Sequence, residues 1–301
     1  MTMKIIPLGT SSGMPTKERN VSALALVLNG HWLLLDCGEG TQYRLLRAPL
    51  RLGQLEAIFI THVHGDHLFG LPGLLATLSM QRREQPLTIY GPVGVKRFIN
   101  SALQATVTRL GYEVTINEID SGLVCRGEGY TVLCLPLDHQ VLDYGYAIVE
   151  DDRPGKFDIE KARALGIPVG PLYGQLQAGH DIRLPDGRLI ESSEVVGERR
   201  KGRRIAYCTD TRPCANSVEL ARGANLLIHE ATYTEDLVAE ARARGHSTAA
   251  QAASIARQAG VERLLITHFS PRYLTSEELL AEARRIFPAT EAARDLVEFN
   301  V

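Results

Sequence analysis

The sequence predicts an α/β protein. Short apolar runs typical of strands alternate with segments whose apolar residues recur at helical spacing. Several of these runs end directly in a histidine or an aspartate, as expected at a sheet edge that faces a cleft. One long stretch rich in glycine, proline and charge interrupts the alternation and indicates an insertion.

The strands follow from apolar runs bounded by turn residues. They are predicted at residues 4–9, 22–28, 31–36, 56–61, 87–91, 130–137, 203–209, 225–230 and 263–268. The helices between them are predicted at residues 70–82, 94–107, 215–222, 247–259 and 276–286. In the segment "GHSTAAQAASIARQAG", Ser247 or Thr248 can cap the helix and Gly260 can end it.

The insertion extends from about Asp151 to Gly202, and its central part is residues 152–198. We expect it to lie outside the core, to project from the domain and to contain only a short helix near 158–165. Residues 1–301 are expected to form a single domain that carries this insertion.

Composition restricts the class of protein. Hydrophobic residues make up 45% of the chain, which is enough for a core, and the net charge of −2 provides no general attraction for nucleic acid. The five cysteines are scattered, with no C-x-x-C pair, which argues against a disulfide framework and against a thiolate zinc site. With no signal-peptide pattern and no apolar run long enough to span a bilayer, we expect a cytoplasmic protein.

The segment "FITHVHGDHLFGLPG" (59–73) places His62, His64, Asp66 and His67 within six positions after a predicted strand. Imidazole nitrogens and carboxylate oxygens suit Zn²⁺. Alternate residues project to different sides, so the four favour two adjacent ions, with His62 and His64 at one and Asp66 and His67 at the other.

Two ions need further ligands from other strand ends. His139, Asp210 and His268 each follow an apolar strand and are the candidates. The carboxylate of Asp210 can bridge two cations at the roughly 3.5–4 Å spacing of two-metal hydrolases.

The H-x-H-x-D-H motif with distant His, Asp and His resembles the metallo-β-lactamase fold, and further motifs resemble bacterial ribonuclease Z (tRNase Z, ribonuclease BN). These motifs are "GTSSGMPTKERN" (9–20), "LLLDCGEGTQYRLL" (33–46), "HGDHLFGLPGLL" (64–75), "YGPVG" (90–94), "GPLYGQLQAG" (170–179), "CTDTRP" (208–213), "HEATY" (229–233), "GHST" (245–248) and "THFSPRY" (267–273). The resemblance covers nearly the whole chain and implies an αββα sandwich of two mixed sheets. Thr209 stands where glycine is expected before the bridging aspartate.

The resemblance implies a zinc-dependent phosphodiesterase that removes the 3′ trailer from tRNA precursors. The products would be a tRNA with a 3′-hydroxyl and a trailer with a 5′-phosphate. Two Zn²⁺ ions per subunit, with Mn²⁺ or Co²⁺ as substitutes, would provide a bridging hydroxide as the nucleophile. Asp66 would orient this water and accept its proton. His246, held by Glu230, would protonate the leaving oxygen, or His246 would only cap the helix that follows.

The resemblance also assigns the insertion a role in binding tRNA, through a Gly-Pro motif at Gly170, Pro171 and Gly174. It implies a homodimer. The basic run "RRKGRR" (199–204) either contacts RNA or is a solvated flank of the insertion. His229 is expected to be structural, and His31 and His180 to lie at the surface. The loop at Asp36 either forms a turn or lies beside the site.

Two other classes remain open. A small-molecule phosphodiesterase or an arylsulfatase-like hydrolase on the same fold would keep the metal ligands but would not need the insertion. A non-catalytic RNA-binding protein on this fold would be expected to lose metal ligands, whereas all seven candidates are present.

Overall fold

The computed structural model describes residues 3–301 and divides into two compact units. The first unit contains the described residues through Gly127, with Thr131–Ile148 and Arg204–Val301. The second unit contains Glu128–Tyr130 and Val149–Arg203. The predicted insertion at 152–198 therefore falls within a compact unit of its own.

One sheet of the first unit has, among residues 3–301, seven strands in the order β16-β1-β2-β3-β4-β5-β6. Their bounds are β1 Met3–Gly9, β2 Ala23–Leu28, β3 His31–Leu35, β4 Leu55–Phe59, β5 Leu87–Gly91, β6 Val114–Glu118 and β16 Phe299–Asn300. The pairs from β16 to β3 are antiparallel, and those from β3 to β6 are parallel. The edge strands β6 and β16 were not predicted, because each buries too little apolar surface to show a strand pattern.

The other sheet has, in the described chain, seven strands in the order β15-β14-β13-β12-β9-β8-β7. Their bounds are β7 Gly122–Gly127, β8 Tyr130–Pro136, β9 Tyr144–Glu150, β12 Arg204–Cys208, β13 Leu226–Glu230, β14 Arg263–Thr267 and β15 Thr290–Ala292. Strands β12 to β15 are parallel. Strand β9 was missed, because Gly145 near its start weakens the pattern. A Cβ at this position would come within 2.7 Å of the Leu220 side chain, which would have to shift to accommodate a larger residue.

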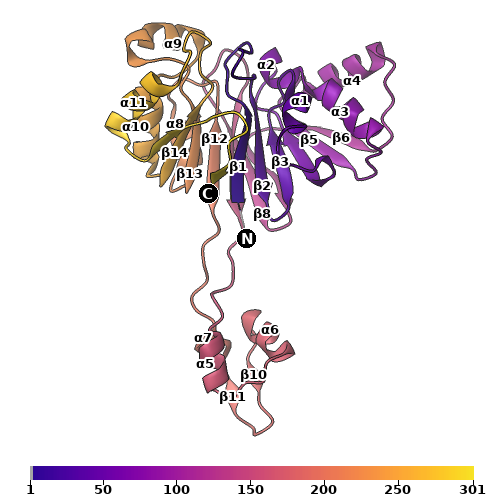
Figure 1. The fold of residues 1–301 in the computed structure, drawn as a ribbon, viewed down its shortest axis with the longest axis vertical. Helices are drawn as coiled ribbons and strands as arrows, with labels where there is room; N and C mark the ends of the chain where they lie inside the picture. Colours follow the sequence, from indigo (N-terminus) through magenta and orange to yellow (C-terminus); the bar gives the residue numbers. More distant parts are fainter. Residues whose placement is uncertain (1–2) are drawn as a thin grey trace. The chain divides into compact units, whose positions relative to one another are not determined.

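Helices cover the outer faces of both sheets (Figure 1). The first sheet packs against α1 Thr41–Leu45, α3 Leu71–Met80 and α4 Val95–Ala105, and the second against α8 Ala215–Ala221, α10 Ala249–Ala259 and α11 Glu277–Ile286. Between the sheets, the ring of Phe59 meets that of Tyr146, whose hydroxyl donates to the Ile60 carbonyl at 2.6 Å. The αββα sandwich of two mixed sheets is thus confirmed.

Helix α10 has the predicted caps. The Thr248 side chain accepts a hydrogen bond from the Gln251 backbone, and the Gln251 side chain accepts one from the Thr248 backbone. Gly260 ends the helix with a positive φ of 65°. A cap of this kind is worth about 1 kcal/mol. Because Thr248 is the cap, the interpretation of His246 as the residue that caps this helix is wrong.

The second unit is more ordered than the sequence suggested. It contains α5 Ile159–Ala164, α6 Pro171–Gln177, α7 Ser192–Val195 and the antiparallel pair β10 Ile182–Arg183 and β11 Leu189–Ile190. Its apolar side chains form a separate core of Ala162, Ile167, Leu176, Ile182, Leu184, Ile190 and Val195. The expectation of only a short helix near 158–165 was wrong, because these apolar residues are too widely spaced to show a period.

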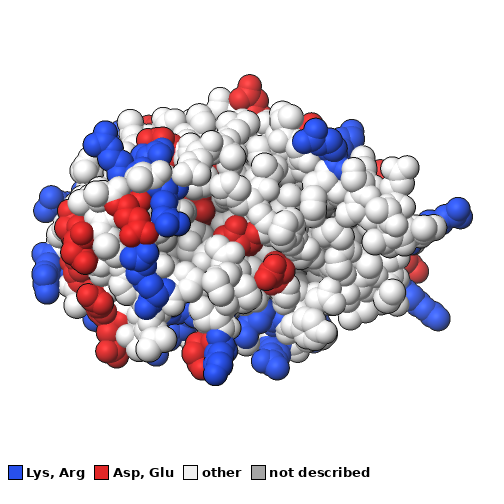
Figure 2. All heavy atoms as spheres, turned by 90° about the horizontal axis from the view of Figure 1, so that it is seen from above, with Lys and Arg blue, Asp and Glu red and all other residues white. Residues whose placement is uncertain are grey.

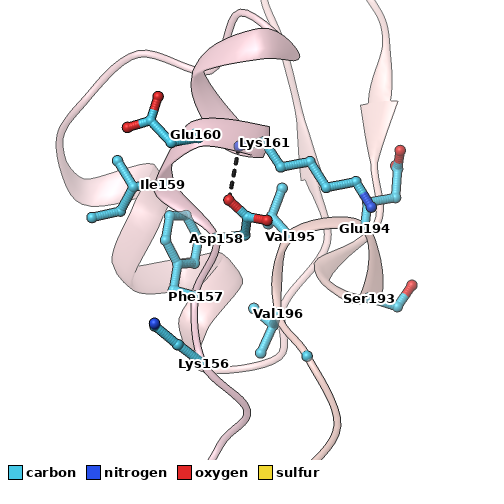
Figure 3. Close-up of a pocket in the computed structure, with 11 residues that line it drawn as sticks. Lys156, Phe157, Asp158, Ile159, Glu160, Lys161, Ser193, Glu194, Val195 and Val196 are labelled. Atoms are coloured by element: carbon cyan, nitrogen blue, oxygen red, sulfur yellow. Dashed lines mark hydrogen bonds between the residues drawn. The ribbon is translucent and has the colours of Figure 1, made fainter.

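A cavity of about 550 Å³ lies in the second unit, between the start of α5 and the α7 segment (Figure 3). Phe157, Ile159 and Val196 line it, together with charged side chains at its edge. The lining holds no histidine, so this cavity lacks the imidazole ligands that the predicted metal centre requires.

The remaining short elements are α2 Gly65–Leu68, α9 Val238–Arg244 and the 3₁₀ turns Leu52–Gln54 and Glu235–Leu237. Among residues 3–301, none of the helices combines the length and the apolar character that a membrane crossing requires.

Candidate metal centre and active site

The candidate site lies where strands of both sheets end. His62 and His64 follow β4, and Asp66 and His67 lie in α2, which comes next. His139 lies between β8 and β9, Asp210 follows β12 and His268 follows β14. Polar side chains at such strand ends face outward from the sheet edge, and all seven belong to the first compact unit.

Three aspartate and histidine residues at these strand ends have left-handed backbone conformations. The φ angles are 59° at Asp36, 49° at Asp210 and 58° at His268. Positive φ is uncommon outside glycine and costs about 1–3 kcal/mol where the surrounding structure enforces it. The sharp turns direct these side chains back toward the strand ends, so the fold maintains local strain at the site.

One cluster brings together His62, His64, His139 and Asp210. The Nδ1 atom of His64 lies 3.0 Å from Nε2 of His62 and 3.3 Å from Nε2 of His139. The Oδ2 atom of Asp210 lies 3.8 Å from His62 Nε2 and 4.0 Å from His139 Nε2. One cation would contact all four groups.

A second cluster brings together Asp66, His67 and His268. Their atoms converge on the other oxygen of Asp210, since Oδ1 lies 3.2 Å from His67 Nε2 and 3.1 Å from His268 Nε2. Both Nε2 atoms are buried, and neither has a hydrogen-bond partner within residues 3–301. Two orphaned nitrogens beside carboxylates fit a cation site, and Asp210 lies between the two clusters as a bridging ligand would.

The buried carboxylates and imidazoles of the two clusters have protonation states that favour the binding of cations. Burial favours the neutral carboxyl groups of Asp66 and Asp210, yet the neighbouring histidines hold both pKa values below their usual range. Burial likewise opposes a charge on His67, but Asp210, Asp36 and Asp66 raise its pKa well above normal. Burial lowers the pKa of His62 and of His139, which keeps both imidazoles neutral, as metal ligands must be.

His246 and Glu230 form a pair beside the second cluster. The Nδ1 atom of His246 lies 2.9 Å from Oε1 of Glu230, a fully buried carboxylate. The Glu230 carboxylate also accepts hydrogen bonds from the Thr211 backbone and the Thr232 hydroxyl. Burial favours the neutral imidazole, but the Glu230 charge and hydrogen bond raise the pKa of His246 to about 9. A buried carboxylate behind an imidazole suits a proton donor.

Asp36 contacts the Nδ1 atom of His67, whereas the Nε2 atom of the ring faces the second cluster. Its buried carboxylate lies 2.9 Å from His67 Nδ1 and accepts hydrogen bonds from the Thr61 backbone at 2.8 Å and the Tyr207 hydroxyl at 3.0 Å. Of the two interpretations of this loop, the structure therefore places Asp36 beside the site. The role of Tyr207 could not be predicted, because it lies on β12, 171 residues away along the chain.

Replacement of Asp36 by asparagine should weaken metal binding at the second cluster by about 10- to 100-fold, because the imidazole loses the charged acceptor that fixes its orientation. Metal titration against a competing chelator measures this change. Glu39→Gln, on the exposed part of the same loop, is the matched control. Equal affinities in the Asp36→Asn variant and the wild type would contradict the prediction.

The clusters open into a cleft of about 520 Å³. Its lining includes Ser12, Gly13, Met14, Gln140, Tyr233, Arg244, Ser270, Pro271 and Arg272, in addition to His64, Asp66, His139, Asp210 and His246. Figure 2 shows a largely uncharged central face with a few acidic groups, and both basic and acidic side chains around its edge. Arg244 and Arg272 both pair with Glu240, so these three side chains together carry one net positive charge.

The other histidines lie apart from the two clusters. His31 and His180 are exposed, as predicted. His229 is fully buried on β13, with its Nδ1 beside the Glu230 carbonyl, which agrees with a structural role.

The second unit holds the residues predicted to contact RNA. Pro171 begins α6, preceded by Gly170 with a φ of 153°, and Gly174 lies within this helix. In the basic run, Arg199, Arg200 and Lys201 are exposed. Arg203 instead pairs with the buried Glu150 at 2.9 Å, so it is part of the internal structure of the unit.

Comparisons with known proteins agree with this fold and site. A family model described as a β-lactamase superfamily domain matches residues 184–269, and one described as the anti-Pycsar protein Apyc1 matches residues 3–121. The crystal structure of human tRNase Z, short form, is similar with a TM-score of 0.71 and 29% identity, over 99% of this chain and 98% of that one.

Two curated relatives, both named ribonuclease Z, match along the whole chain. The protein from Microcystis aeruginosa is 48% identical over 99% of this chain and 96% of its own length. That from Acaryochloris marina is 46% identical over 99% of this chain and 98% of its own length. With the αββα fold and the His/Asp clusters at the strand ends, these matches show that the chain belongs to the ribonuclease Z family.

Proposed function

We propose that this protein is a metal-dependent phosphodiesterase that removes the 3′ trailer from tRNA precursors, leaving a 3′-hydroxyl on the tRNA and a 5′-phosphate on the trailer. The observation that carries the proposal is the convergence of seven metal-ligating side chains and the His246–Glu230 pair in one cleft. The relatives named ribonuclease Z, 46–48% identical over nearly the whole chain, identify the substrate class.

Two divalent cations fit the two clusters. His62, His64 and His139 would hold one, Asp66, His67 and His268 the other, and Asp210 would contact both. Zn²⁺ is favoured by the histidine-rich donor set, and Mn²⁺ or Co²⁺ are substitutes. When bound, such ions lower the pKa of water and neutralise charge on a phosphate.

Asp66 is proposed to orient the attacking water and to accept its proton. The Oδ2 atom of Asp66 accepts a hydrogen bond from the Gly13 backbone at 2.8 Å, which fixes the carboxylate at the floor of the cleft. Because the neighbouring histidines hold its pKa low, the side chain stays ionised and is able to act as an acceptor at neutral pH.

His246 is proposed to donate a proton to the 3′-oxygen as it leaves. This imidazole lines the cleft, and Glu230 holds its Nδ1, which leaves the other ring nitrogen for the leaving group. With a pKa of about 9, His246 carries the proton at neutral pH. No side-chain nucleophile is needed, because water is the attacking group.

The second compact unit is proposed as the arm that binds folded tRNA, through Gly170, Pro171 and Gly174. Its own apolar core makes it a preformed surface rather than a disordered segment, which suits recognition of RNA by shape. The exposed Arg199, Arg200 and Lys201 add positive charge for phosphates.

A homodimer in the cytoplasm completes the proposal. Several large apolar side chains on and near α1, α2 and α3 are exposed, namely Tyr43, Leu46, Phe69 and Met80. A second copy of the chain would bury this surface. All five cysteines are free, which suits a reducing compartment.

The test is incubation of the purified protein with an end-labelled tRNA precursor, with and without a chelator, followed by mapping of both product ends. We expect cleavage at the start of the trailer that stops on metal removal and returns when Zn²⁺ is added. Hydrolysis of a small phosphodiester without cleavage of the precursor would favour the small-molecule hydrolase instead. Bound zinc with no hydrolysis of either substrate would contradict the proposal.

A further inference from the structure

Asp143 is a fully buried acid in the turn that precedes β9. Its Oδ1 atom lies 3.2 Å from Nδ1 of His62. Neither carboxylate oxygen has a hydrogen-bond partner within the described residues 3–301. A buried carboxyl group without hydrogen-bond donors is unfavourable in its ionised form unless a positive charge lies nearby.

The charged side chains around Asp143 oppose its ionisation. Burial and the negative charges of Asp210, Asp36 and Glu230 raise the pKa of Asp143 well above its usual range, and His67 acts in the opposite direction. The Asp143 carboxyl group approaches the metal-ligating residue His62 at Nδ1, the ring nitrogen other than Nε2. That Nε2 atom points into the first cluster, 3.0 Å from His64 Nδ1.

The hydrogen-bond pattern fixes which nitrogen of His62 carries the proton. The Thr61 hydroxyl lies 2.9 Å from His62 Nδ1 but also bonds both oxygens of Asp36, at 3.0 and 3.1 Å. Its single proton serves the Asp36 carboxylate, so toward His62 the hydroxyl oxygen can only accept. His62 Nδ1 therefore carries the proton, and Oδ1 of Asp143 lies 3.2 Å from the same nitrogen, outside hydrogen-bond geometry.

The arrangement repeats the one behind His67. There, the buried carboxylate of Asp36 lies 2.9 Å from Nδ1 of the ring, and Nε2 faces the second cluster. Each of the two clusters thus has one fully buried histidine with a fully buried carboxylate behind it. The Asp36 carboxylate is satisfied by three further donors from Thr61 and Tyr207, whereas the Asp143 carboxylate is not.

We infer that Asp143 is a positioning residue for the metal ion held by His62, His64 and His139. Its carboxylate holds the Nδ1–H side of the His62 ring so that Nε2 faces the cation, and its negative charge offsets that of the cation across the ring. The inference rests on the metal centre of the proposed function. It assigns Asp143 to one of the two ions and Asp36 to the other.

The test uses the full-length protein stripped of metal and titrated with Zn²⁺ against a competing chelator, and with Co²⁺ followed by its visible absorption. In Asp143→Asn, we expect one of the two affinities to fall by about 10- to 100-fold while the other stays within a factor of two or so. In Asp36→Asn, we expect the other affinity to fall instead. Asp120→Asn is the matched control, because Asp120 approaches the neighbouring Tyr144 but no metal ligand.

Thermal unfolding gives a readout that is independent of activity. Because neither carboxyl oxygen of Asp143 has a hydrogen-bond partner among the described residues, Asp143→Asn breaks no hydrogen bond and should leave the metal-free melting temperature unchanged or higher. The rise in melting temperature on adding Zn²⁺ should be smaller than in the wild type. Asp143→Ser is the second variant, since its hydroxyl can accept from Nδ1 without charge. It should show the same direction of change.

Three results would overturn the inference. Wild-type affinities for both ions in Asp143→Asn and Asp143→Ser would show that Asp143 does not act on the site. A lower metal-free melting temperature in both variants with unchanged affinities would show that it only fills space. If the wild type itself binds no metal at these clusters, both this inference and the metal centre of the proposed function fail together.

Discussion

Replacing His246 by alanine is expected to lower kcat for precursor cleavage by about 10²- to 10⁴-fold while the protein retains its metal. The loss follows because the leaving 3′-oxygen would have to depart without a proton. Parallel measurement of kcat and of zinc content distinguishes a proton donor from a metal ligand. This distinction matters because ligand atoms of His246, Asp210 and His268 lie within 4.8 Å of one another.

The pH profile gives a second readout of this role. An acid catalyst acts while protonated, so kcat should be maintained below the pKa of His246, about 9, and fall as the pH rises through it. Glu230→Gln removes the charge that raises this pKa, so the falling limb should move to lower pH. His31→Ala, an exposed histidine away from the clusters, is the control and should leave the profile unchanged.

Unchanged turnover in the His246→Ala variant would refute the assignment. Loss of zinc together with activity would instead assign His246 to the metal centre. In either case the prediction of a cation site at His62, His64, His139 and Asp210 stands, because that cluster does not include His246.

Removal of the second compact unit is expected to abolish cleavage of tRNA precursors and to spare hydrolysis of a small phosphodiester. The metal clusters and the His246–Glu230 pair all belong to the first unit, so the chemical groups remain. What is lost is the proposed surface for folded tRNA. Rates with precursor and with bis(p-nitrophenyl) phosphate, measured on the same preparation, test this separation.

The structure indicates where the ends of this deletion should lie. The backbones of Arg153 and Arg200 exchange two hydrogen bonds of 2.9 Å, so their ends are close enough to be joined by a Gly-Gly turn in place of residues 154–199. This design keeps the pairing of Glu150 with Arg153 and Arg203. Gly170→Ala with Pro171→Ala in the full chain is the milder companion variant. Loss of both activities together with a loss of zinc would mean that the unit is needed for folding.

The sequence alone determined much of the first unit. Strands such as β5 (Leu87–Gly91) and helices such as α10 were predicted closely, because a buried face leaves a period in the sequence and caps use few residue types. The seven metal-ligand candidates were also found from sequence, because each follows an apolar strand, and the structure brings them together.

Only the tertiary structure could show which residues lie against the metal-ligand candidates on the side away from the metal clusters. Asp36 and Tyr207 meet at 3.0 Å although 171 positions separate them, and Asp143 reaches His62 from a turn before an unpredicted strand. No local spacing records such contacts, because they arise when two sheets pack face to face. The compact core of the second unit could likewise not be predicted from the sequence. Its apolar residues are scattered along the chain and come together only in the folded unit. The buried face of a strand or helix leaves a periodic pattern in the sequence. The residues that orient the ligands of a metal site, by contrast, depend on which distant segments pack together.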